Sequence, residues 1–362
     1  MHAFIPSTIY LDPEVQEDPV TKRILKKFPG VPVCLVSDKK QIKSPAALTN
    51  AKKQLYLTKF KGTAIKDCQG RGGDYICCHY YTVSLISDCH LECTYCILQD
   101  YLKNNPVITI FTNLQEILSE ISKKAIENPD AILRYGPGEL SDSLALDPIT
   151  EFGKDLIRHA NQHKNIILEL KTKTHNIDHI INEDHAGNTV IAWSINPQNY
   201  IEKEEFKCSS LNERFTAARQ CLDKKFPIAF HLDPLLYCDA WKDEYTKLIK
   251  EVASLFPSQA IAWISMGSLR FTPLLKKIVT DRFPSSKIMT AEIYPNQDGK
   301  MRYFRPIREE MYKHLISLFK KYLPDTPYYL CMETRAVWKN VMGFVPKDTH
   351  EVERLLTKNC RR

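Results

Sequence analysis

The stretch SDCHLECTYCILQDYL, residues 87–102, decides the fold of this chain. Its three cysteines, Cys89, Cys93 and Cys96, follow the spacing C-x3-C-x2-C, and an aromatic residue, Tyr95, comes directly before the third. Three thiols so close together in one segment are typical of a metal centre, because thiolates are strong ligands for zinc and for iron.

The number of cysteines bears on the kind of metal centre. A structural zinc ion normally takes four protein ligands, so zinc here needs a fourth ligand from elsewhere, and Cys77 or Cys78 could supply it. A four-iron cluster held by three cysteine thiolates instead keeps one iron open for another molecule. The spacing alone leaves both centres possible.

Length and composition describe a globular chain. The 362 residues suffice for one large α/β domain or two ordinary ones, and 43% hydrophobic with 26% charged residues is an ordinary soluble composition. No run approaches the ~18 apolar residues of a membrane-spanning helix, and the N-terminal residues lack the basic and apolar regions of a signal peptide. We therefore expect a cytoplasmic protein without a membrane partner.

The cysteine content and the net charge indicate which kinds of chemistry and of binding partner suit this chain. Twelve cysteines in a long chain without a signal peptide indicate metal ligation or thiol chemistry rather than disulfides. The net charge of +7, from 50 basic and 43 acidic residues, permits nucleic-acid binding but does not establish it.

Strands and helices alternate from about residue 80. Runs rich in β-branched and aromatic residues predict strands at 80–86, 131–135, 165–171, 189–195, 227–232 and 260–266. Helical patterns follow at 112–126, 148–163, 210–225, 239–256 and 272–283. Thr112 or Asn113 is expected to cap the first helix. Six strands alternating with helices predict a parallel sheet, as a doubly wound sheet or an open partial barrel.

Polar residues collect where the predicted strands end. In chain order these strand ends carry Cys89, GPGELSD, KTK, SIN and HLDP. The carboxyl ends of parallel strands meet at one rim, and the chemistry of barrel enzymes lies at that rim. This convergence indicates an enzyme.

The flanking segments are expected to be less regular. Residues 1–75 contain many prolines, and helices are predicted there only at 18–28 and 44–57. Residues 298–308, DGKMRYFRPIR, interleave basic with aromatic residues, which suits phosphates and stacked bases. We expect three parts: an N-terminal extension over 1–76, a barrel over 77–290 and a C-terminal α+β segment over 291–362.

The cysteine pattern with its preceding aromatic residue resembles the radical S-adenosylmethionine (radical SAM) superfamily. The longer stretch DCHLECTYCILQDYL resembles one branch, the spore photoproduct lyase family and its DNA photolyase-like relatives. The likeness is loose up to about residue 76 and better from Cys77 to about Phe344. It implies a partial (β/α)6 TIM-type barrel of the radical SAM type, in which Cys89, Cys93 and Cys96 hold a [4Fe–4S] cluster and the open iron binds S-adenosylmethionine.

The resemblance also implies cofactor contacts at the strand ends. Glu139, in GPGEL, resembles the superfamily's G-G-E signature, whose carboxylate binds the ammonium group of S-adenosylmethionine. Lys173, in KTK, resembles a lysine that reaches the carboxylate of the cofactor. Ser141, Ser194 and Asn196 complete the expected set. Each residue alone could be an ordinary turn residue, and only their joint position is informative.

The implied substrate is a thymine photolesion in DNA, and the implied partner is an electron donor such as flavodoxin or ferredoxin. His231 and Asp233, two apart in HLDP, face the same side of a strand. They are candidate substrate ligands or acid–base groups, although Asp233 could simply end the strand before a proline.

The basic segment supplies the expected DNA contacts. In the spore enzyme a C-terminal hairpin near this point contacts DNA and wedges into the duplex beside the lesion. The candidates here are Lys300, Arg302, Tyr303 and Arg305. A solvated loop is the alternative.

This chain departs from the family in the residue that would return a hydrogen atom to the repaired thymine. The family's strand-two loop carries a cysteine that donates hydrogen to the repaired thymine, and the nearest match here is Glu139. A family tyrosine after the third cluster cysteine is Ile97 here, whereas Tyr95 is kept. The hydrogen is then expected from another thiol, from Tyr95 or from 5′-deoxyadenosine. Cys331, in a strand-like setting that could return to the barrel mouth, is the candidate thiol.

Other cysteines permit further interpretations. Cys68, Cys77 and Cys78 form an accessory metal site or pack near the barrel mouth, and Cys77 and Cys78 are the next candidate donors. Cys34 and Cys208 fit no pattern.

Three hypotheses about function follow. The favoured one is a radical SAM enzyme that cleaves S-adenosylmethionine to a 5′-deoxyadenosyl radical and repairs a thymine photolesion in DNA. The first alternative is a radical SAM enzyme with a different nucleic-acid or small-molecule substrate. The second is a non-catalytic, zinc-stabilised nucleic-acid-binding module.

Overall fold

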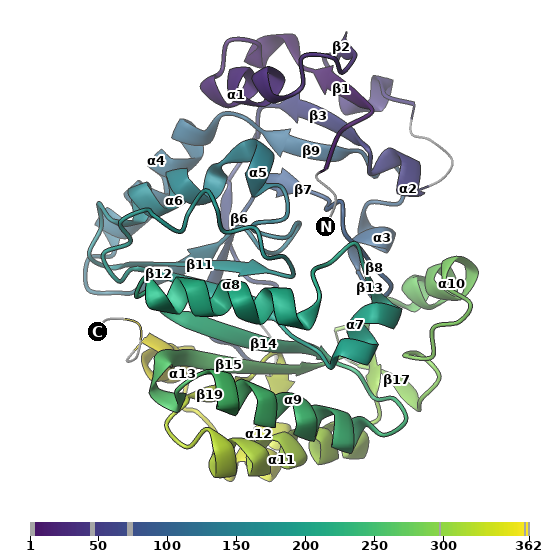
Figure 1. The fold of residues 1–362 in the computed structure, drawn as a ribbon, viewed down its shortest axis with the longest axis vertical. Coiled ribbons are helices and arrows are strands. Elements are labelled where there is room, and N and C mark those ends of the chain that lie inside the picture. The colour runs from purple at the N-terminus through teal and green to yellow at the C-terminus, as the bar shows by residue number, and fades with distance from the viewer. Residues whose placement is uncertain (1–3, 44–47, 71–74, 297, 358–359, 361–362) are drawn as a thin grey trace.

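The computed structural model of the chain describes residues 4–43, 48–70, 75–296, 298–357 and 360. Its main sheet has eight strands in the order β19-β15-β14-β12-β11-β10-β6-β4. Six parallel strands match the predicted runs: β6 (Tyr80–Val83), β10 (Leu133–Gly136), β11 (Ile166–Thr172), β12 (Thr189–Ser194), β14 (Ile228–Leu235) and β15 (Ile261–Ser268). The sheet curls into a partial barrel (Figure 1), which confirms the predicted fold class.

Two further strands extend this sheet beyond the prediction. β19 (Tyr328–Leu330) adds a parallel strand beside β15, and β4 (Ile65–Asp67) adds an antiparallel strand beside β6. Both are three residues long, and such short runs carry no periodicity that could be recognised in the sequence.

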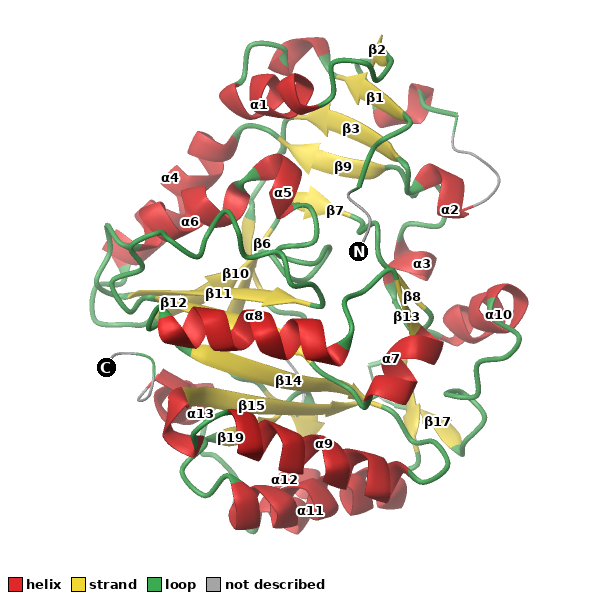
Figure 2. Ribbon diagram, viewed as in Figure 1, coloured by secondary structure: helices red, strands yellow, loops and turns green. Residues whose placement is uncertain are grey.

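Most of the predicted helices cover the strands from outside (Figure 2). They are α4 (Leu114–Glu127), α6 (Phe152–Ala160), α8 (Leu211–Asp223) and α9 (Trp241–Leu255), whereas α10 (Pro273–Arg282) lies apart from the strands and contacts α3 (Leu98–Tyr101). α8 begins with a capping box between Ser210 and Glu213. Asn113 occupies the N-cap position of α4, as predicted for one of two candidates, but makes no side-chain capping bond, because its side-chain oxygen accepts from the backbone of Phe60. Thr112, the other candidate, donates to Asp18.

Two predicted elements are broken. The run at 80–86 ends as β6 at Val83, and β7 (Ile86–Ser87) pairs in a different sheet. The helix predicted over 148–163 is divided into α5 (Asp147–Thr150) and α6 by Glu151, whose φ is 54°.

The N-terminal residues are more regular than predicted. A second sheet has the order β2-β1-β3-β9-β7, built from β2 (Val33–Leu35), β1 (Thr8–Leu11), β3 (Gln54–Thr58), β9 (Ile108–Phe111) and β7. α1 (Pro19–Lys27) confirms one predicted helix. The helix predicted over 44–57 is wrong over 54–57, where Leu55, Tyr56 and Leu57 are all buried in a strand. Within the rest of this range, α2 (Leu48–Ala51) is a single turn, and residues 44–47 lie outside the described residues.

The C-terminal residues contain the expected hairpin, made by β17 (Ile293–Pro295) and β18 (Met301–Tyr303). The remaining elements are β5 (Tyr75–Ile76), β8 (Glu92–Cys93), α3 (Leu98–Tyr101), α7 (Gln198–Glu204), β13 (Glu205–Phe206), β16 (Arg270–Phe271), α11 (Arg305–Tyr322), β20 (Glu333–Thr334), α12 (Arg335–Met342) and α13 (Thr349–Thr357). Of the helices that the structure describes, none is long and apolar enough to cross a membrane.

The carboxyl ends of the barrel strands meet the cysteine segment. The arrowheads of β14 and β15 point toward the side where β8, β13, α10 and β17 gather (Figure 1). The candidate site is therefore built at the rim that the sequence predicted.

Candidate active site

The cysteine segment is held by a buried lysine. Lys52, which is 2% exposed, donates to the backbone carbonyls of Cys89 at 2.8 Å and Leu91 at 3.1 Å and pairs with Asp88 at 3.3 Å. Burial alone lowers the pKa of Lys52, but the charges of Asp88, Cys96 and Cys89 raise it. A fixed cation therefore lies beside a segment that carries three potential thiolates.

Three thiols in one segment, with the buried cation Lys52 beside them, suit a [4Fe–4S] cluster. Such a cluster binds each thiolate through a different iron, so three cysteines leave one iron open for another molecule. The positive charge of Lys52 would compensate part of the negative charge of the thiolates.

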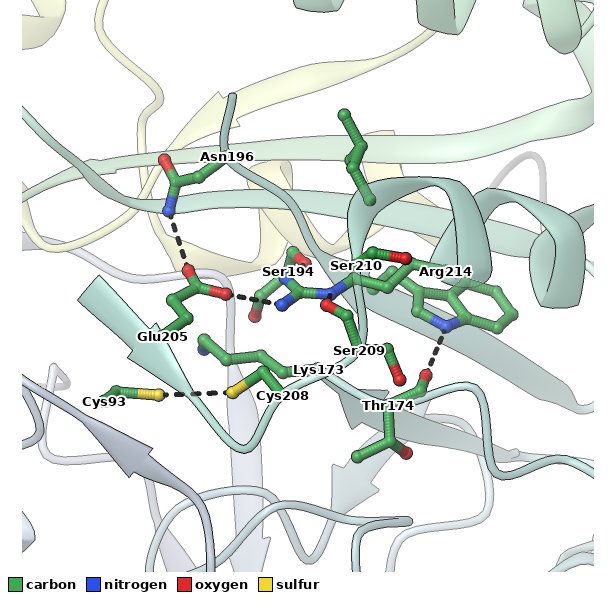
Figure 3. Close-up of polar contacts among 12 residues, drawn as sticks. Cys93, Lys173, Thr174, Ser194, Asn196, Glu205, Cys208, Ser209, Ser210 and Arg214 are labelled. Carbon is green, nitrogen blue, oxygen red and sulfur yellow. Dashed lines mark hydrogen bonds and ion pairs between the residues drawn. The ribbon is translucent and has the colours of Figure 1, made fainter. Parts of the chain in front are cut away.

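A buried polar network lies on the other side of Cys93 (Figure 3). The Glu205 carboxylate accepts from Arg214 at 2.6 Å, from Asn196 at 3.1 Å and from the Tyr95 hydroxyl at 2.5 Å. Glu205 is positioned because β13 pairs with β8, which places this residue opposite Cys93.

Three of the predicted cofactor contacts gather in this network. Lys173 and Asn196 flank Glu205, and the backbone carbonyl of Ser194 accepts from Arg214 at 2.8 Å (Figure 3). Burial alone lowers the pKa of Lys173, but the charges of Cys93 and Glu205 raise it to about 12. Lys173 is therefore a permanent cation beside the cysteine segment.

The network also contains residues that the sequence did not indicate. Arg214 lies in α8 and is 0% exposed. Burial raises the pKa of Glu205, but Arg214 and Lys173 lower it to about 2. The Cys208 sulfur lies 3.7 Å from the Cys93 sulfur, although no sequence pattern linked these two cysteines.

A cavity of about 320 Å³ opens beside the cysteine segment at the rim of the barrel. The cavity is lined by Tyr95, Cys96 and Ile97 of the cysteine segment and by Glu139 of the loop that follows β10. The far side includes Lys171, His231, Asp233, Lys300 and Cys331. His231 and Asp233 therefore do face one space from the same strand, as their spacing predicted.

Two charge pairs shape the far wall. His231 Nε2 lies 2.7 Å from Glu169 Oε1, and Asp233 accepts from Arg270 at 2.9 and 3.0 Å. Burial raises the pKa of Glu169, but His231, together with a buried arginine, lowers it to about 2. A Cβ at Gly267 would lie 2.8 Å from the Asp233 carboxylate, so this close packing requires glycine.

Besides Cys96, three thiols reach the same cavity: Cys68, Cys78 and Cys331. Cys331 follows β19, and its backbone N–H donates to Met266 at 2.7 Å, which returns the residue to the barrel mouth. Cys77 contacts Cys68 and Cys78 but is not among the residues that line the cavity. Cys68, Cys77 and Cys78 thus lie together at the barrel mouth, where their packing was predicted.

Other predicted site residues lie elsewhere. Ser141 is buried beside a second, small cavity, with Asp142 and Ser143. Gly136, the first glycine of GPG, allows two neighbouring strands to pack closely, because a Cβ at this position would overlap the backbone of Glu169. This glycine therefore serves strand packing and not the close approach of a ligand.

The predicted DNA contacts are only partly available. Arg302 is 1% exposed and makes two 2.7 Å bonds to Asp298. Tyr303 is 0% exposed, and its hydroxyl donates to the Ile288 carbonyl. The prediction that these two side chains contact DNA is therefore corrected, because neither can reach a phosphate or a base as placed. Arg305 remains partly exposed.

Comparisons with known proteins agree with this geometry. The family model described as spore photoproduct lyase matches residues 4–327. The spore photoproduct lyase of Geobacillus sp. (strain Y412MC61) is 25% identical over 298 residues, 80% of this chain and 85% of the relative. That of Bacillus subtilis (strain 168) is 25% identical over 295 residues, 79% of this chain and 84% of the relative.

Solved structures share the fold. Spore photoproduct lyase complexed with dinucleoside spore photoproduct superimposes with a TM-score of 0.82 and 22% identity, covering 91% of this chain and 100% of that chain. A mutant with bound AdoMet and dinucleoside spore photoproduct has a TM-score of 0.81 and 23% identity, with the same coverage. Because the family model spans most of its length, this chain belongs to the spore photoproduct lyase family of radical SAM enzymes.

Proposed function

We propose that this protein repairs a thymine photolesion in DNA by radical SAM chemistry. The observation that carries the proposal is the single cavity that extends from Tyr95 and Cys96 to His231 and Cys331. It joins the cysteine segment, where a radical would be generated, to polar groups and thiols at the rim of a barrel of this family. The cavity volume of about 320 Å³ lies within the usual range for small-molecule sites.

The cofactors are a [4Fe–4S] cluster on Cys89, Cys93 and Cys96 and S-adenosylmethionine beside it. When bound, they supply a 5′-deoxyadenosyl radical that abstracts a hydrogen atom from the substrate. Lys173 offers a positive charge to the cofactor carboxylate, and Glu139 offers a negative charge to its ammonium group. An electron donor such as flavodoxin or ferredoxin supplies the reducing electron.

The far wall suits a pair of linked thymidines. Lys171, Lys300 and Arg270 bring positive charge to the cavity, which favours the phosphodiester of a DNA lesion. His231 and Asp233 present hydrogen-bonding groups to the polar edges of thymine. Both groups are held by buried partners, so they are positioned before the substrate binds.

The last step must return a hydrogen atom to the thymine radical. An S–H bond is weak enough to give its hydrogen to carbon, and the thiol is then left as a thiyl radical. We assign this step to Cys331, because it lines the cavity while the strand-two loop offers Glu139. The thiyl radical regains hydrogen from 5′-deoxyadenosine, and Tyr95, which lines the same cavity, would relay this hydrogen.

Anaerobic turnover on dinucleoside spore photoproduct tests the proposal. Reconstituted wild type should release two thymidines from each lesion, detected by mass spectrometry. Cys89→Ala, Cys93→Ala and Cys96→Ala should lose 5′-deoxyadenosine formation, whereas Cys34→Ala, at an exposed thiol, should keep it. Reductive cleavage of S-adenosylmethionine without thymine release would indicate a different substrate. A colourless protein that contains only zinc would contradict the radical chemistry itself.

A further inference from the structure

Three potential metal ligands meet outside the active site. His79 Nδ1 lies 3.1 Å from Glu353 Oε1, and His350 Nδ1 lies 3.3 Å from Glu353 Oε2. The ligand atoms of all three residues lie within 4.8 Å of one another. Bonds of about 2.1 Å to one tetrahedral ion place its ligand atoms about 3.4 Å apart, so the observed spacing suits a single ion.

The three residues come from opposite ends of the chain. His79 lies between β5 and β6, directly after Cys78 of the cavity wall. His350 and Glu353 lie on α13, and their i, i+3 spacing places them on the same face of this helix. α13 packs against the barrel at β15, so an ion here would join the C-terminal helix to the start of the first barrel strand (Figure 1).

The charge of Glu353 needs compensation. This carboxylate is 5% exposed, and among the described residues its ion-pair partners are the two imidazoles, with no lysine or arginine. Buried charges in proteins are paired or coordinate metals. Neutral imidazoles do not neutralise a carboxylate, whereas a divalent cation between the three groups does.

The surroundings of His79 resemble those of a metal ligand. Its Nε2 lies 3.2 Å from the Tyr81 hydroxyl, and metal-binding histidines usually hold their second nitrogen in such a hydrogen bond. In the tautomer whose Nε2–H donates to this hydroxyl, Nδ1 presents a lone pair on the side of the carboxylate, which is the arrangement of a metal-binding histidine. His79 also has a φ of 54°, a conformation that side chains rarely adopt and that directs this residue inward.

We propose that His79, His350 and Glu353 bind a zinc ion that fastens α13 to the first barrel strand. Two imidazoles and one carboxylate are a common zinc ligand set, and the exposed side of His350 leaves room for water as the fourth ligand. This site is separate from the cysteine segment and does not depend on the proposed repair reaction.

Metal analysis of the reconstituted holoenzyme tests this site. The protein is incubated with zinc, freed of excess metal by gel filtration, and assayed for zinc and iron by mass spectrometry. Wild type should retain about one zinc per chain in addition to its cluster iron. His350→Ala and Glu353→Gln should bind zinc at least ~100-fold more weakly with unchanged iron, and Tyr81→Phe about 10-fold more weakly.

The controls separate zinc binding from misfolding and from binding to thiols. His179→Ala, at an exposed histidine of another segment, should retain zinc like wild type. Glu353→Gln keeps a hydrogen-bonding side chain, so α13 should stay folded on the barrel. Added zinc should raise the unfolding midpoint of wild type but not of His350→Ala. A zinc-free wild type, or zinc retained by both His350→Ala and Glu353→Gln, would overturn the proposal.

Discussion

His231 Nε2 lies 2.7 Å from Glu169 Oε1, and the other oxygen of this carboxylate accepts from Arg134 at 3.0 Å. One carboxylate thus orients a histidine that lines the cavity and neutralises an arginine that is 0% exposed. The geometry of the cavity wall and the stability of the barrel therefore depend on the same residue.

Glu169→Gln should destabilise the fold and reduce lesion turnover. The amide cannot neutralise Arg134, and breaking a buried pair costs roughly 3–5 kcal/mol. Chemical denaturation measures this loss. Glu183→Gln is the matched control, because its partner Arg158 is 61% exposed and such pairs contribute at most ~1 kcal/mol. An equally small loss in both variants would contradict a structural role for Glu169.

Lys173→Ala and Glu139→Ala should keep the cluster iron but weaken S-adenosylmethionine binding. Loss of one partner of a charge pair in a closed site costs roughly 2–5 kcal/mol, or ~30-fold and more in affinity. Calorimetry on the cluster-loaded protein measures this effect. Lys154→Ala, which removes a lysine paired on the surface, should bind like wild type. Unchanged affinity in both site variants would mean that the assigned contacts are wrong.

Cys331→Ala should uncouple lesion cleavage from clean repair. Without the Cys331 thiol, the substrate radical persists and forms off-pathway products, such as sulfite adducts when dithionite is the reductant. Turnover of a substrate with deuterium at C6, analysed by mass spectrometry, reports the abstraction step separately. Cys34→Ala should repair like wild type. Clean repair by Cys331→Ala would shift the role to Cys78 or Cys68, which line the same cavity.

The regular alternation of strands and helices made the barrel predictable from the sequence. Contacts between segments that are distant in the sequence could not be predicted in this way. The strands β10, β11, β12, β14 and β15 lie close to their predicted positions because each contains a run rich in β-branched, aromatic and other apolar residues. The N-terminal sheet was missed because its strands pair with β9 and β7, which lie far along the chain.

The same distinction holds for the site. Cys89, Cys93, Cys96 and Lys173 were recognisable from local motifs. Glu205 and Arg214 were not, because neither belongs to a local motif: Glu205 lies in a two-residue strand and Arg214 in a helix, and only the fold brings them together and buries them. Arg302 illustrates the opposite error, because a basic residue that was expected to be exposed is buried and forms an ion pair with Asp298 of the same segment.

Arg305→Ala and Arg302→Ala should affect DNA binding differently. Each phosphate contact adds about one unit to the slope of affinity against salt, so Arg305→Ala should reduce this slope by about one. Arg302→Ala should leave the slope unchanged and lower the unfolding midpoint, because Arg302 is buried with Asp298. Fluorescence anisotropy on duplex DNA at several salt concentrations tests both. A reduced slope in Arg302→Ala would show that its ion pair opens on DNA.

Asp147→Asn should stabilise the protein at neutral and alkaline pH. Asp147 is 3% exposed, its Oδ1 accepts from the Gly153 N–H at 2.7 Å, and burial raises its pKa to about 6. A folded-state pKa above the unfolded value of ~3.9 means that stability is lost as pH rises between these two values. An amide keeps the bond from Gly153 without ionising, so the variant should gain about 3 kcal/mol at pH 8 and nothing near pH 4.

Unfolding midpoints of wild type and variant, recorded from pH 4 to pH 8 at equal cluster loading, measure this gain. Glu151→Gln is a control of opposite sign. Burial raises the pKa of Glu151, but its ion pairs with Lys154 and Lys27 lower it to about 2, so its charge stabilises the fold at pH 8. That variant should lose a little stability at pH 8. A pH-independent difference between wild type and Asp147→Asn would mean that Asp147 is ionised in the folded protein as readily as in the unfolded chain.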